Sequence, residues 1–259
     1  MGTSIITICF NNLADLQKTC ASIDAQTTKP DEHWIINGSS NKDIENWLAA
    51  STQPDYRKWI NERDKGIADA FNKGIEKATQ EITHLLHAGD TYASNEVLTI
   101  VNNYFAQHHL VQWISGNIQI VRGGIKVVVG KPFDKNKLYR GMRSVAHPTW
   151  FVKKEVYTRV GLFRVDVKIG MDYDLMCRLA DEPYAYINET LAVFDDTGIS
   201  TTQYLASLKE NIFIYESHYG FSILCRIWQI RLSLLHKLLQ TPFGKWLFQL
   251  KKNLGLANA

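Results

Sequence analysis

The sequence is poor in cysteine and in long apolar runs. It has four cysteines among 259 residues, and none of them form a CxxC pair or match the spacing of a zinc motif. This usage favours a reduced, cytoplasmic compartment. No uninterrupted apolar stretch of about 18 residues occurs, so no membrane-spanning helix is predicted. The N-terminus lacks a basic segment followed by a long apolar one, and we expect no secretory signal.

Acidic residues are missing from one end of the chain. The net charge of +3 is too small to indicate nucleic-acid binding. No aspartate or glutamate follows Glu216, whereas six basic residues do. Over residues 221–254 these basic residues are mixed with aromatic and aliphatic ones at helical spacing, a pattern that suits the anionic inner face of the cell membrane. Packing on the rest of the chain, or on a second copy in a homo-oligomer, explains the pattern equally well.

Strand-like and helix-like segments alternate in the first half of the chain. Short β-branched runs at residues 4–10, 33–36, 58–60 and 82–86 predict strands, and apolar spacing at 13–25, 41–50 and 67–79 predicts helices. This alternation predicts a parallel sheet with right-handed crossovers. Ligands bind such sheets beyond the carboxyl ends of the strands. We therefore expect the polar residues that follow these strands to line one edge: Asn11, Asn37, Asp64 and Asp90.

The second half has a different pattern. Residues 111–129 predict antiparallel strands with a turn at Gly123–Gly124, and residues 184–194 predict a further extended segment. Helices are predicted at 153–160, 172–181, 201–219 and 221–254, the last with a break near Thr241 and Pro242. The chain is thus expected to be an α/β protein, with one domain over residues 1–200 and a helical extension over 201–259.

The most informative segment runs from Glu62 to Ile75 (ERDKGIADAFNKGI) and is followed by a strand and the turn His87-Ala88-Gly89-Asp90. Four further segments follow in order: AHPTWFV (146–152), GLF (161–163), MDYDL (171–175) and DTGIS (196–200). Together they resemble the inverting family-two glycosyltransferases of the GT-A fold, particularly bacterial members that build envelope polysaccharides. Each segment alone is weak evidence for this resemblance, but the five segments in this order are specific for the family.

The resemblance implies a GT-A fold with a mostly parallel central sheet, a nucleotide-binding half over 1–110 and an acceptor-binding half over 111–200. The implied reaction moves a hexosyl or N-acetylhexosaminyl group from a UDP-sugar to a hydroxyl of a glycan or lipid-linked glycan. Asp90 would hold a Mg²⁺ or Mn²⁺ ion that neutralises the leaving diphosphate, and Gly89 would let the backbone turn sharply beside it. Asp172 would take the proton of the acceptor hydroxyl.

The same resemblance implies which residues contact the nucleotide: Thr7, Phe10, Asn12, Asn37, Asp64 and Lys65. Asn37 stands where the family commonly has an aspartate that hydrogen-bonds uracil, and its amide still offers a donor and an acceptor. Asp174 is the nearest rival to Asp172 as base, but two positions away at a helix start it should point elsewhere.

Simpler explanations exist for each of these residues. Asp90 could cap a helix or close a loop, and Asp172 and Asp174 could serve only as first-turn acids that interact with the helix dipole. Lys65 could be a solvated lysine, and His147 a packed polar residue. With Asn37 in place of an aspartate and no carboxylate in His87–Gly89, a catalytically silent GT-A module that binds nucleotide or a partner is the alternative function. A Rossmann oxidoreductase is disfavoured, because no GxGxxG follows the first strand.

Overall fold

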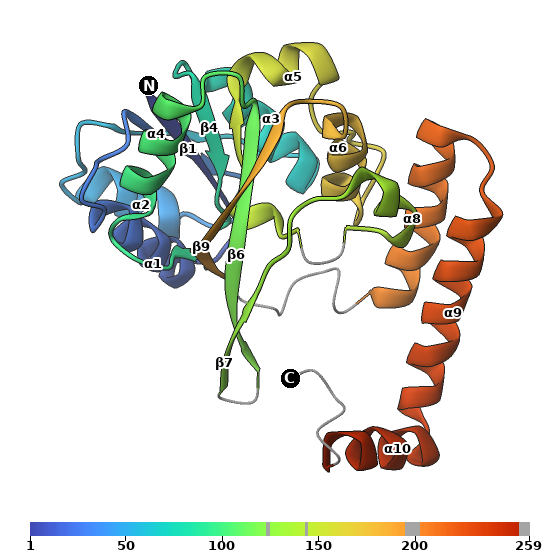
Figure 1. Ribbon diagram of the computed structural model, residues 1–259. Coiled ribbons are helices and arrows are strands. Elements are labelled where there is room, and N and C mark those ends of the chain that lie inside the picture. The colour runs from blue at the N-terminus through green and yellow to red at the C-terminus, as the bar shows by residue number, and fades with distance from the viewer. Residues whose placement is uncertain (123–124, 143–144, 195–202, 254–259) are drawn as a thin grey trace.

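A computed structural model describes residues 1–122, 125–142, 145–194 and 203–253. It shows one nine-stranded sheet with helices on both faces, and three further helices at the C-terminal end of the chain (Figure 1). This arrangement confirms the predicted α/β class with a helical C-terminal extension. The predicted domain boundary at residue 200 lies outside the described residues.

The first half of the chain forms a parallel sheet. Its strands are β1 (Thr3–Cys9), β2 (Glu32–Asn37), β3 (Arg57–Asn61) and β4 (Ile82–Leu85), in the order β3-β2-β1-β4. They alternate with α1 (Leu13–Asp24), α2 (Asp43–Ala50) and α3 (Ile67–Lys77). The prediction of parallel βαβ units is therefore confirmed, and the carboxyl ends of β1, β2 and β4 meet at one edge of the sheet.

The second half extends the sheet with mixed pairing. β8 (Phe151–Lys153) runs antiparallel to β4, and the sheet continues through β6 (Trp113–Arg122), β9 (Tyr184–Phe194) and β5 (Thr91–Tyr92). β7 (Ile125–Val129) pairs antiparallel with β6, as predicted, although the turn at Gly123–Gly124 lies outside the described residues. β6 and β9 are parallel, so the sheet is parallel around β1 and mixed beyond β4.

Several elements of the second half connect the sheet to the site. These are α4 (Val97–Gln107), α5 (Lys154–Val160), α6 (Met171–Leu179) and the short 3₁₀ segments η1 (Lys135–Arg140) and η2 (His147–Thr149). The helices α5 and α6 confirm two predictions within two residues at each end. Neither α4 nor β5 was predicted.

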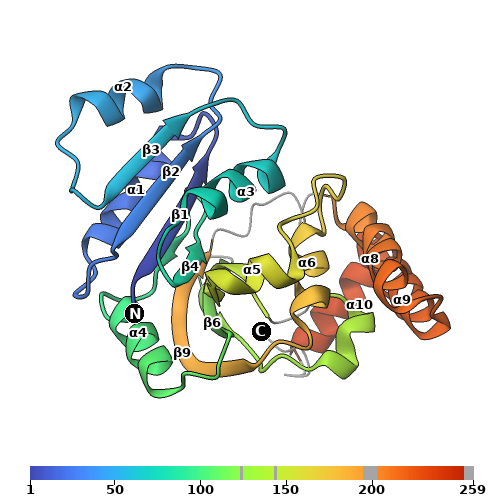
Figure 2. The same ribbon diagram turned by 90° about the horizontal axis from the view of Figure 1, so that it is seen from above.

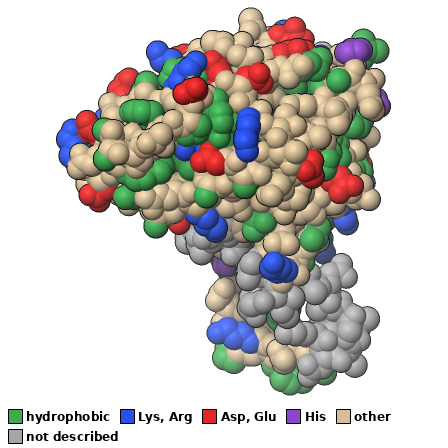
Figure 3. Space-filling view, turned by 90° about the vertical axis from the view of Figure 1, so that its left-hand side faces the viewer, with side chains coloured by type: hydrophobic (Ala, Val, Ile, Leu, Met, Phe, Trp, Pro, Cys, Tyr) green, Lys and Arg blue, Asp and Glu red, His purple; other side chains and the backbone are tan. Residues whose placement is uncertain are grey.

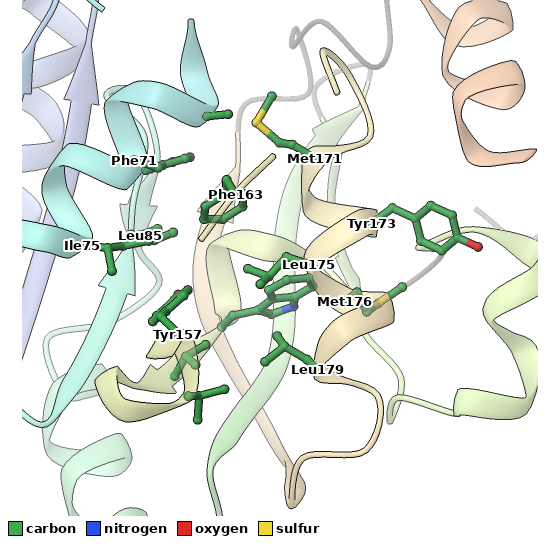
Figure 4. Packing of buried hydrophobic residues seen from close by; sticks show 14 of the residues in the cluster. Phe71, Ile75, Leu85, Tyr157, Phe163, Met171, Tyr173, Leu175, Met176 and Leu179 are labelled. Atoms are coloured by element: carbon green, nitrogen blue, oxygen red, sulfur yellow. The ribbon is translucent and has the colours of Figure 1, made fainter. Parts of the chain in front are cut away.

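Alternating residues of β1 separate two cores. Ile6 and Ile8 face α3, α5 and α6, whereas Ile5 packs toward α1 and α4 on the other face (Figure 2). Figure 4 shows Phe71 of α3 and Phe163 facing Met171 and Leu175 of α6 across the first of these cores. α3 lies very close to the sheet at Gly74, where a Cβ atom would be 2.2 Å from Ile6 Cγ2.

The C-terminal helices are α8 (Tyr204–Tyr219), α9 (Ile223–Gln240) and α10 (Pro242–Asn253). The interruption at Thr241 confirms the predicted break. α8 packs on α6, α9 packs on α8 and η1, and α10 packs on α9. None of the helices in the described part of the chain combines the length and apolar character needed to cross a bilayer.

Candidate active site

A cavity of about 390 Å³ opens at the carboxyl ends of β1 and β4. Three of the predicted nucleotide contacts, Phe10, Asn12 and Asp64, line it together. The remaining lining residues come from the end of β1, the start of α3 and the turn after β4: Ile8, Cys9, Gly66, Ile67, Ala70, His87 and Ala88. The structure thus brings together residues that lie almost eighty positions apart in the sequence, at the edge where ligands bind parallel sheets.

The loop after β1 presents an aromatic ring to this cavity. Phe10 is 60% exposed although it is a large apolar residue. Its backbone N–H donates to Asn12 Oδ1 at 2.9 Å, which shapes the turn between β1 and α1. An exposed aromatic face at the mouth of a cavity is suited to stacking on a planar ring.

Asp64 depends on a glycine that the sequence patterns did not single out. A Cβ atom on Gly38 would lie 1.8 Å from Asp64 Oδ2, so any larger residue at 38 would displace the carboxylate. Asp64 Oδ1 also accepts a hydrogen bond from the Gly66 N–H at 2.9 Å. The neighbouring Lys65 is exposed, and it is not among the residues that line the cavity.

Two of the predicted contacts lie inside the sheet instead. Thr7 is fully buried, and its hydroxyl lies 3.0 Å from His33 Nε2. Asn37 is 4% exposed; its amide donates to Asn61 Oδ1 at 2.8 Å and its oxygen accepts from the Ser39 N–H at 3.1 Å. Both side chains therefore support the strand ends, and neither lines the cavity.

The turn after β4 is held by a threonine of α1. Gly89 has a φ of 110°, a conformation that glycine adopts without strain. Its N–H donates to Thr19 Oγ1 at 2.9 Å, and the same hydroxyl donates to the Asp90 carbonyl at 2.7 Å. Thr19 thus fixes the backbone on both sides of the Gly89–Asp90 bond, and Asp90 itself is 3% exposed.

The oxygen chemistry of this turn suits a hard cation but offers few ligands. Among the described residues, no group of three His, Cys, Asp or Glu side chains is arranged to hold a metal ion. Mg²⁺ is commonly bound through one or two carboxylates together with substrate phosphates. Asp90 therefore fits as the protein's share of such a site only when a phosphate-bearing ligand supplies the other oxygens.

Asp172 lies in the first turn of α6 and is half-buried. Burial raises the pKa of its carboxyl from 3.8 to about 6, and the nearby His87 opposes that rise. The pKa of His87 is lowered to about 4, chiefly by burial and then by His147, with Asp172 acting in the opposite direction. His87 also lines the cavity. This histidine therefore places Asp172 beside the space that a ligand would occupy.

His147 belongs to an aromatic cluster behind this site. It is 3% exposed, and burial lowers its pKa to about 3, so the ring is neutral at physiological pH. Its ring centroid lies 5.3 Å from that of Trp150 and 5.4 Å from that of Phe71. Phe71 in turn contacts His87 edge-on at 4.7 Å. The histidine thus packs as part of the wall that orients His87.

Asp174 faces a set of cationic groups. The carboxylate is fully buried, with Oδ2 2.8 Å from Arg178 Nη2 and Oδ1 2.9 Å from His218 Nε2. Arg164 Nη1 lies 3.4 Å from Oδ1. Both oxygens are thus engaged, Oδ2 by Arg178 within α6 and Oδ1 by Arg164 and by His218 of α8. Asp174 therefore has a structural role, and Asp172 is the carboxylate of this pair that lies near His87.

A glutamate of α8 holds the turn before α6. Glu210 accepts hydrogen bonds from the backbone N–H groups of Lys168, Ile169 and Gly170, at 3.0, 2.8 and 2.6 Å. α6 begins at the next residue, Met171, and carries Asp172 in its first turn. The orientation of Asp172 is therefore coupled to a helix of the C-terminal extension.

Asn72 of α3 has a comparable positioning role. Asn72 forms a two-sided pair with the backbone of Phe163, accepting from its N–H at 2.8 Å and donating to its carbonyl at 2.9 Å. This pair connects two segments of the family resemblance that are 91 residues apart. Asn72 thus fixes the GLF loop against the helix that borders the cavity.

Comparison with known proteins decides the family. The sequence model described as "Glycosyl transferase family 2" matches residues 4–160, which is more than half of the chain. This chain belongs to glycosyl transferase family 2. The matched region contains the whole cavity and the Asp90 turn, while Asp172 and the C-terminal helices lie beyond it.

Curated relatives of this family 2 chain come from mycobacteria. It is 31% identical over 204 residues to the uncharacterized glycosyltransferase Rv1514c of Mycobacterium tuberculosis (strain ATCC 25618 / H37Rv), covering 76% of each chain. It is 24% identical over 202 residues to the PGL/p-HBAD biosynthesis glycosyltransferase of Mycobacterium bovis (strain BCG / Pasteur 1173P2), covering 75% of this chain and 77% of that protein.

Solved structures of low sequence identity share the fold of this family 2 chain. S. aureus TarS 1–349 in complex with UDP aligns with a TM-score of 0.61 at 13% identity, over 85% of this chain and 67% of that one. The chain spans only 40% of the longer TarS structure. The mannosyltransferase PcManGT from Pyrobaculum calidifontis, in complex with GDP-Man and Mn²⁺, aligns with a TM-score of 0.60 at 16% identity, over 99% of this chain and 81% of that one. The GT-A fold is thereby confirmed.

Sequence reasoning missed four residues that build this family 2 site. Gly38 and His87 carried a signal, because each lies just after a predicted strand. Thr19 and Glu210 carried none, since their partners are 70 and 40 residues away and only the folded chain brings them together.

Proposed function

We propose that this chain is an inverting glycosyltransferase that uses a nucleoside-diphosphate sugar. The observation that carries the proposal is the position of His87, which lines the cavity and interacts electrostatically with Asp172. A nucleotide-sized space and a carboxylate with a raised pKa are therefore neighbours. Cavities that combine apolar walls with a titratable group of perturbed pKa are the usual location of active sites.

Asp172 acts as the general base. With a pKa of about 6 it is mostly ionised at neutral pH, and it is a stronger base than an ordinary aspartate. The acceptor hydroxyl gives its proton to Asp172 while its oxygen forms a bond to the anomeric carbon. The bond from that carbon to the diphosphate oxygen breaks at the same time, and the nucleoside diphosphate leaves with the electron pair. A single displacement of this kind inverts the anomeric centre.

The nucleotide occupies the cavity at the end of β1. Phe10 stacks on the base, and Asp64 accepts hydrogen bonds from the nucleoside. Lys65 is exposed beside Asp64 and reaches a phosphate. The solved structures of TarS with UDP and of PcManGT with GDP-Man support a nucleotide-sugar as donor. We propose a UDP-sugar with a hexosyl or N-acetylhexosaminyl group, in which Asn37 and Thr7 act by shaping the strand ends.

Asp90 holds Mg²⁺ or Mn²⁺ together with the diphosphate. The ion supplies charge neutralisation as negative charge develops on the leaving oxygen. The mannosyltransferase structure with Mn²⁺ supports a divalent cation. Since Asp90 is the one carboxylate that we propose as a protein ligand, the ion should bind weakly until the diphosphate is present.

The acceptor is a glycan or lipid-linked glycan of a bacterial envelope. The relative named for PGL/p-HBAD biosynthesis supports a glycolipid or polysaccharide pathway. The half of the chain assigned to the acceptor, residues 111–200, contains a second cavity of about 380 Å³ between η1 and α6. Lys131 and Arg140 are among its lining residues, and such cations suit an acceptor that carries phosphate.

Calorimetric titration with UDP and with GDP, each with and without Mn²⁺, tests the binding part of the proposal. Wild-type protein should bind UDP more tightly with Mn²⁺, Asp64→Ala should weaken binding in both conditions, and Asp90→Ala should remove the Mn²⁺ dependence. Asp181→Ala is the matched control, because Asp181 is an exposed carboxylate whose partner is the exposed Lys135. Equal UDP affinity for wild type and Asp64→Ala would place the nucleotide elsewhere.

The silent-module alternative requires a separate measurement. Release of nucleoside diphosphate from a panel of nucleotide-sugars, with a bacterial membrane extract as acceptor, reports turnover. Wild-type release with loss in Asp172→Asn supports an enzyme. Nucleotide binding without release from any donor supports a binding module.

A further inference from the structure

Large apolar side chains are exposed along α9 and α10. On α9 they are Ile223, Leu224, Ile227, Ile230, Leu234, Leu235 and Leu238, and on α10 they are Phe243, Trp246, Leu247, Phe248 and Leu250. Their exposed fractions run from 37% for Leu247 to 66% for Ile223. Soluble monomers rarely expose a contiguous apolar surface of this kind unless something binds to it.

The exposed stripe of α9 is distinct from the face that holds this helix in place. Cys225 and Gln229 are buried, and the Gln229 amide donates to the Tyr139 carbonyl of η1 at 3.1 Å. The exposed residues recur every three or four positions on another side, as in Ile227, Ile230 and Leu234. Packing within the part of the chain that the structure describes therefore accounts for one face of α9 and leaves this stripe exposed to solvent.

Basic side chains lie among these apolar ones. Arg231, Lys237 and Lys245 are exposed on the two helices. Arg226 is engaged within the protein, because its Nε and Nη2 donate to the two carboxylate oxygens of Glu216, each at 2.7 Å. No acidic residue follows Glu216. Figure 3 shows basic and hydrophobic side chains together on the part of the molecule that projects below its main body.

We propose that α9 and α10 form a docking surface for an anionic lipid bilayer. Apolar side chains would enter the boundary between headgroups and acyl chains, and Arg231, Lys237 and Lys245 would contact lipid phosphates. Trp246, Phe243 and Phe221, which are 59%, 60% and 72% exposed, are the residue types that concentrate at such boundaries. This inference is independent of the proposed reaction, because it concerns binding to lipid and not turnover.

A second copy of the chain suits the same surface less well. A two-fold dimer would bring the same patch of both copies together. The positive charges of Arg231, Lys237 and Lys245 from both copies would then gather in one interface, and residues 217–259 of neither copy contain an acidic residue to neutralise them. An anionic bilayer satisfies both the apolar and the cationic side chains at once.

Co-flotation of the full chain with vesicles tests this inference. Wild-type protein should float with phosphatidylcholine vesicles that contain phosphatidylglycerol, and not with pure phosphatidylcholine vesicles. The triple variant Arg231→Gln, Lys237→Gln, Lys245→Gln should lower the partition coefficient about a hundredfold. The double variant Ile230→Ser, Leu234→Ser should lower it on the order of tenfold or more.

Matched controls separate this surface from general charge and apolarity. Lys18→Gln, Lys77→Gln, Lys126→Gln removes the same charge from exposed lysines elsewhere, and Leu110→Ser, Val128→Ser removes apolar side chains of comparable exposure. Both controls should float like wild type. Circular dichroism and light scattering establish that each variant is folded and show its oligomeric state. Equal flotation of the α9 variants and their controls, or a wild-type dimer that ignores vesicles and dissociates in Ile230→Ser, Leu234→Ser, would overturn the inference.

Discussion

The Glu210 carboxylate accepts a hydrogen bond from the Gly170 N–H at 2.6 Å, one residue before the helix that carries Asp172 begins. The same carboxylate binds the two preceding N–H groups. Three backbone donors that point at one carboxylate fix the path of the chain into α6. One of the C-terminal helices, α8, therefore positions the start of α6, although the family match ends at residue 160.

Replacing Glu210 should impair turnover more than nucleotide binding. Glu210→Ala frees the 168–170 turn, and a displacement of Asp172 by about 1 Å is expected to lower kcat on the order of a hundredfold. Glu210→Gln, which keeps one acceptor oxygen, should retain more activity. Steady-state kinetics with UDP titrations measure both quantities, with Glu76→Ala as an exposed control on α3. Unchanged kcat in Glu210→Ala, when Asp172→Asn is inactive, would show that the turn does not position the base.

Asp174→Asn should destabilise the fold without removing the nucleotide cavity. It takes the negative charge away from Arg178, Arg164 and His218 at a buried position. The free energy of unfolding should fall by about 3 kcal/mol. Urea denaturation measures this, and Asp181→Asn, which breaks an exposed pair with Lys135, should cost less than about 1 kcal/mol. Similar losses in the two variants would argue against a structural role for the buried carboxylate.

The raised pKa of Asp172 predicts two pH dependences. The transfer rate should rise with pH up to about 6 as the base loses its proton, and then level off. A carboxyl with a raised folded pKa stabilises the fold below its unfolded value of 3.8, and that contribution is lost as pH rises through about 6. Relative to Asp172→Asn, wild-type stability should thus decline by about 3 kcal/mol across this window, because each pKa unit of the shift corresponds to about 1.4 kcal/mol. Parallel pH curves for the two proteins would contradict a raised pKa.

Gly38→Ala should act through Asp64. The added methyl would lie 1.8 Å from Asp64 Oδ2, so the carboxylate must move out of its place in the cavity wall. UDP affinity should fall about tenfold, comparable to the loss of one good hydrogen bond to a charged group. In an Asp64→Ala background the same substitution should cost little, because the obstructing oxygen is gone. If the effects of the two substitutions on UDP affinity are additive, Gly38 does not act through Asp64.

Much of the fold follows from short-range patterns. The buried β-branched run of β1 and the apolar spacing of α3 indicate a strand and a helix without tertiary information. The strand β5, formed by Thr91 and Tyr92, is too short for a sequence pattern to predict. It forms because these two residues pair with β9. By contrast, α4 is indicated by the sequence, because Val97, Val101 and Phe105 recur at helical spacing and are buried.

The site was predictable where it depends on strand ends. Phe10, Asn12 and Asp64 follow strands, and a parallel sheet places strand ends together. Thr7 and Asn37 also lie at strand ends, but their side chains are buried against neighbouring strands, Thr7 beside His33 and Asn37 beside Asn61. The environment of Asp172 could not be predicted, since its pKa depends on His87, a residue 85 positions earlier that only the folded chain brings near.

We propose that Asp172 is the base of a glycosyl transfer whose nucleotide lies beside His87. The most direct test compares wild type and Asp172→Asn for UDP affinity by calorimetry and for nucleoside diphosphate release from nucleotide-sugars with a membrane extract. If Asp172 is the base, Asp172→Asn should bind UDP with the wild-type affinity and release nucleoside diphosphate at least about a thousandfold more slowly. Release at the wild-type rate from folded Asp172→Asn protein would contradict it.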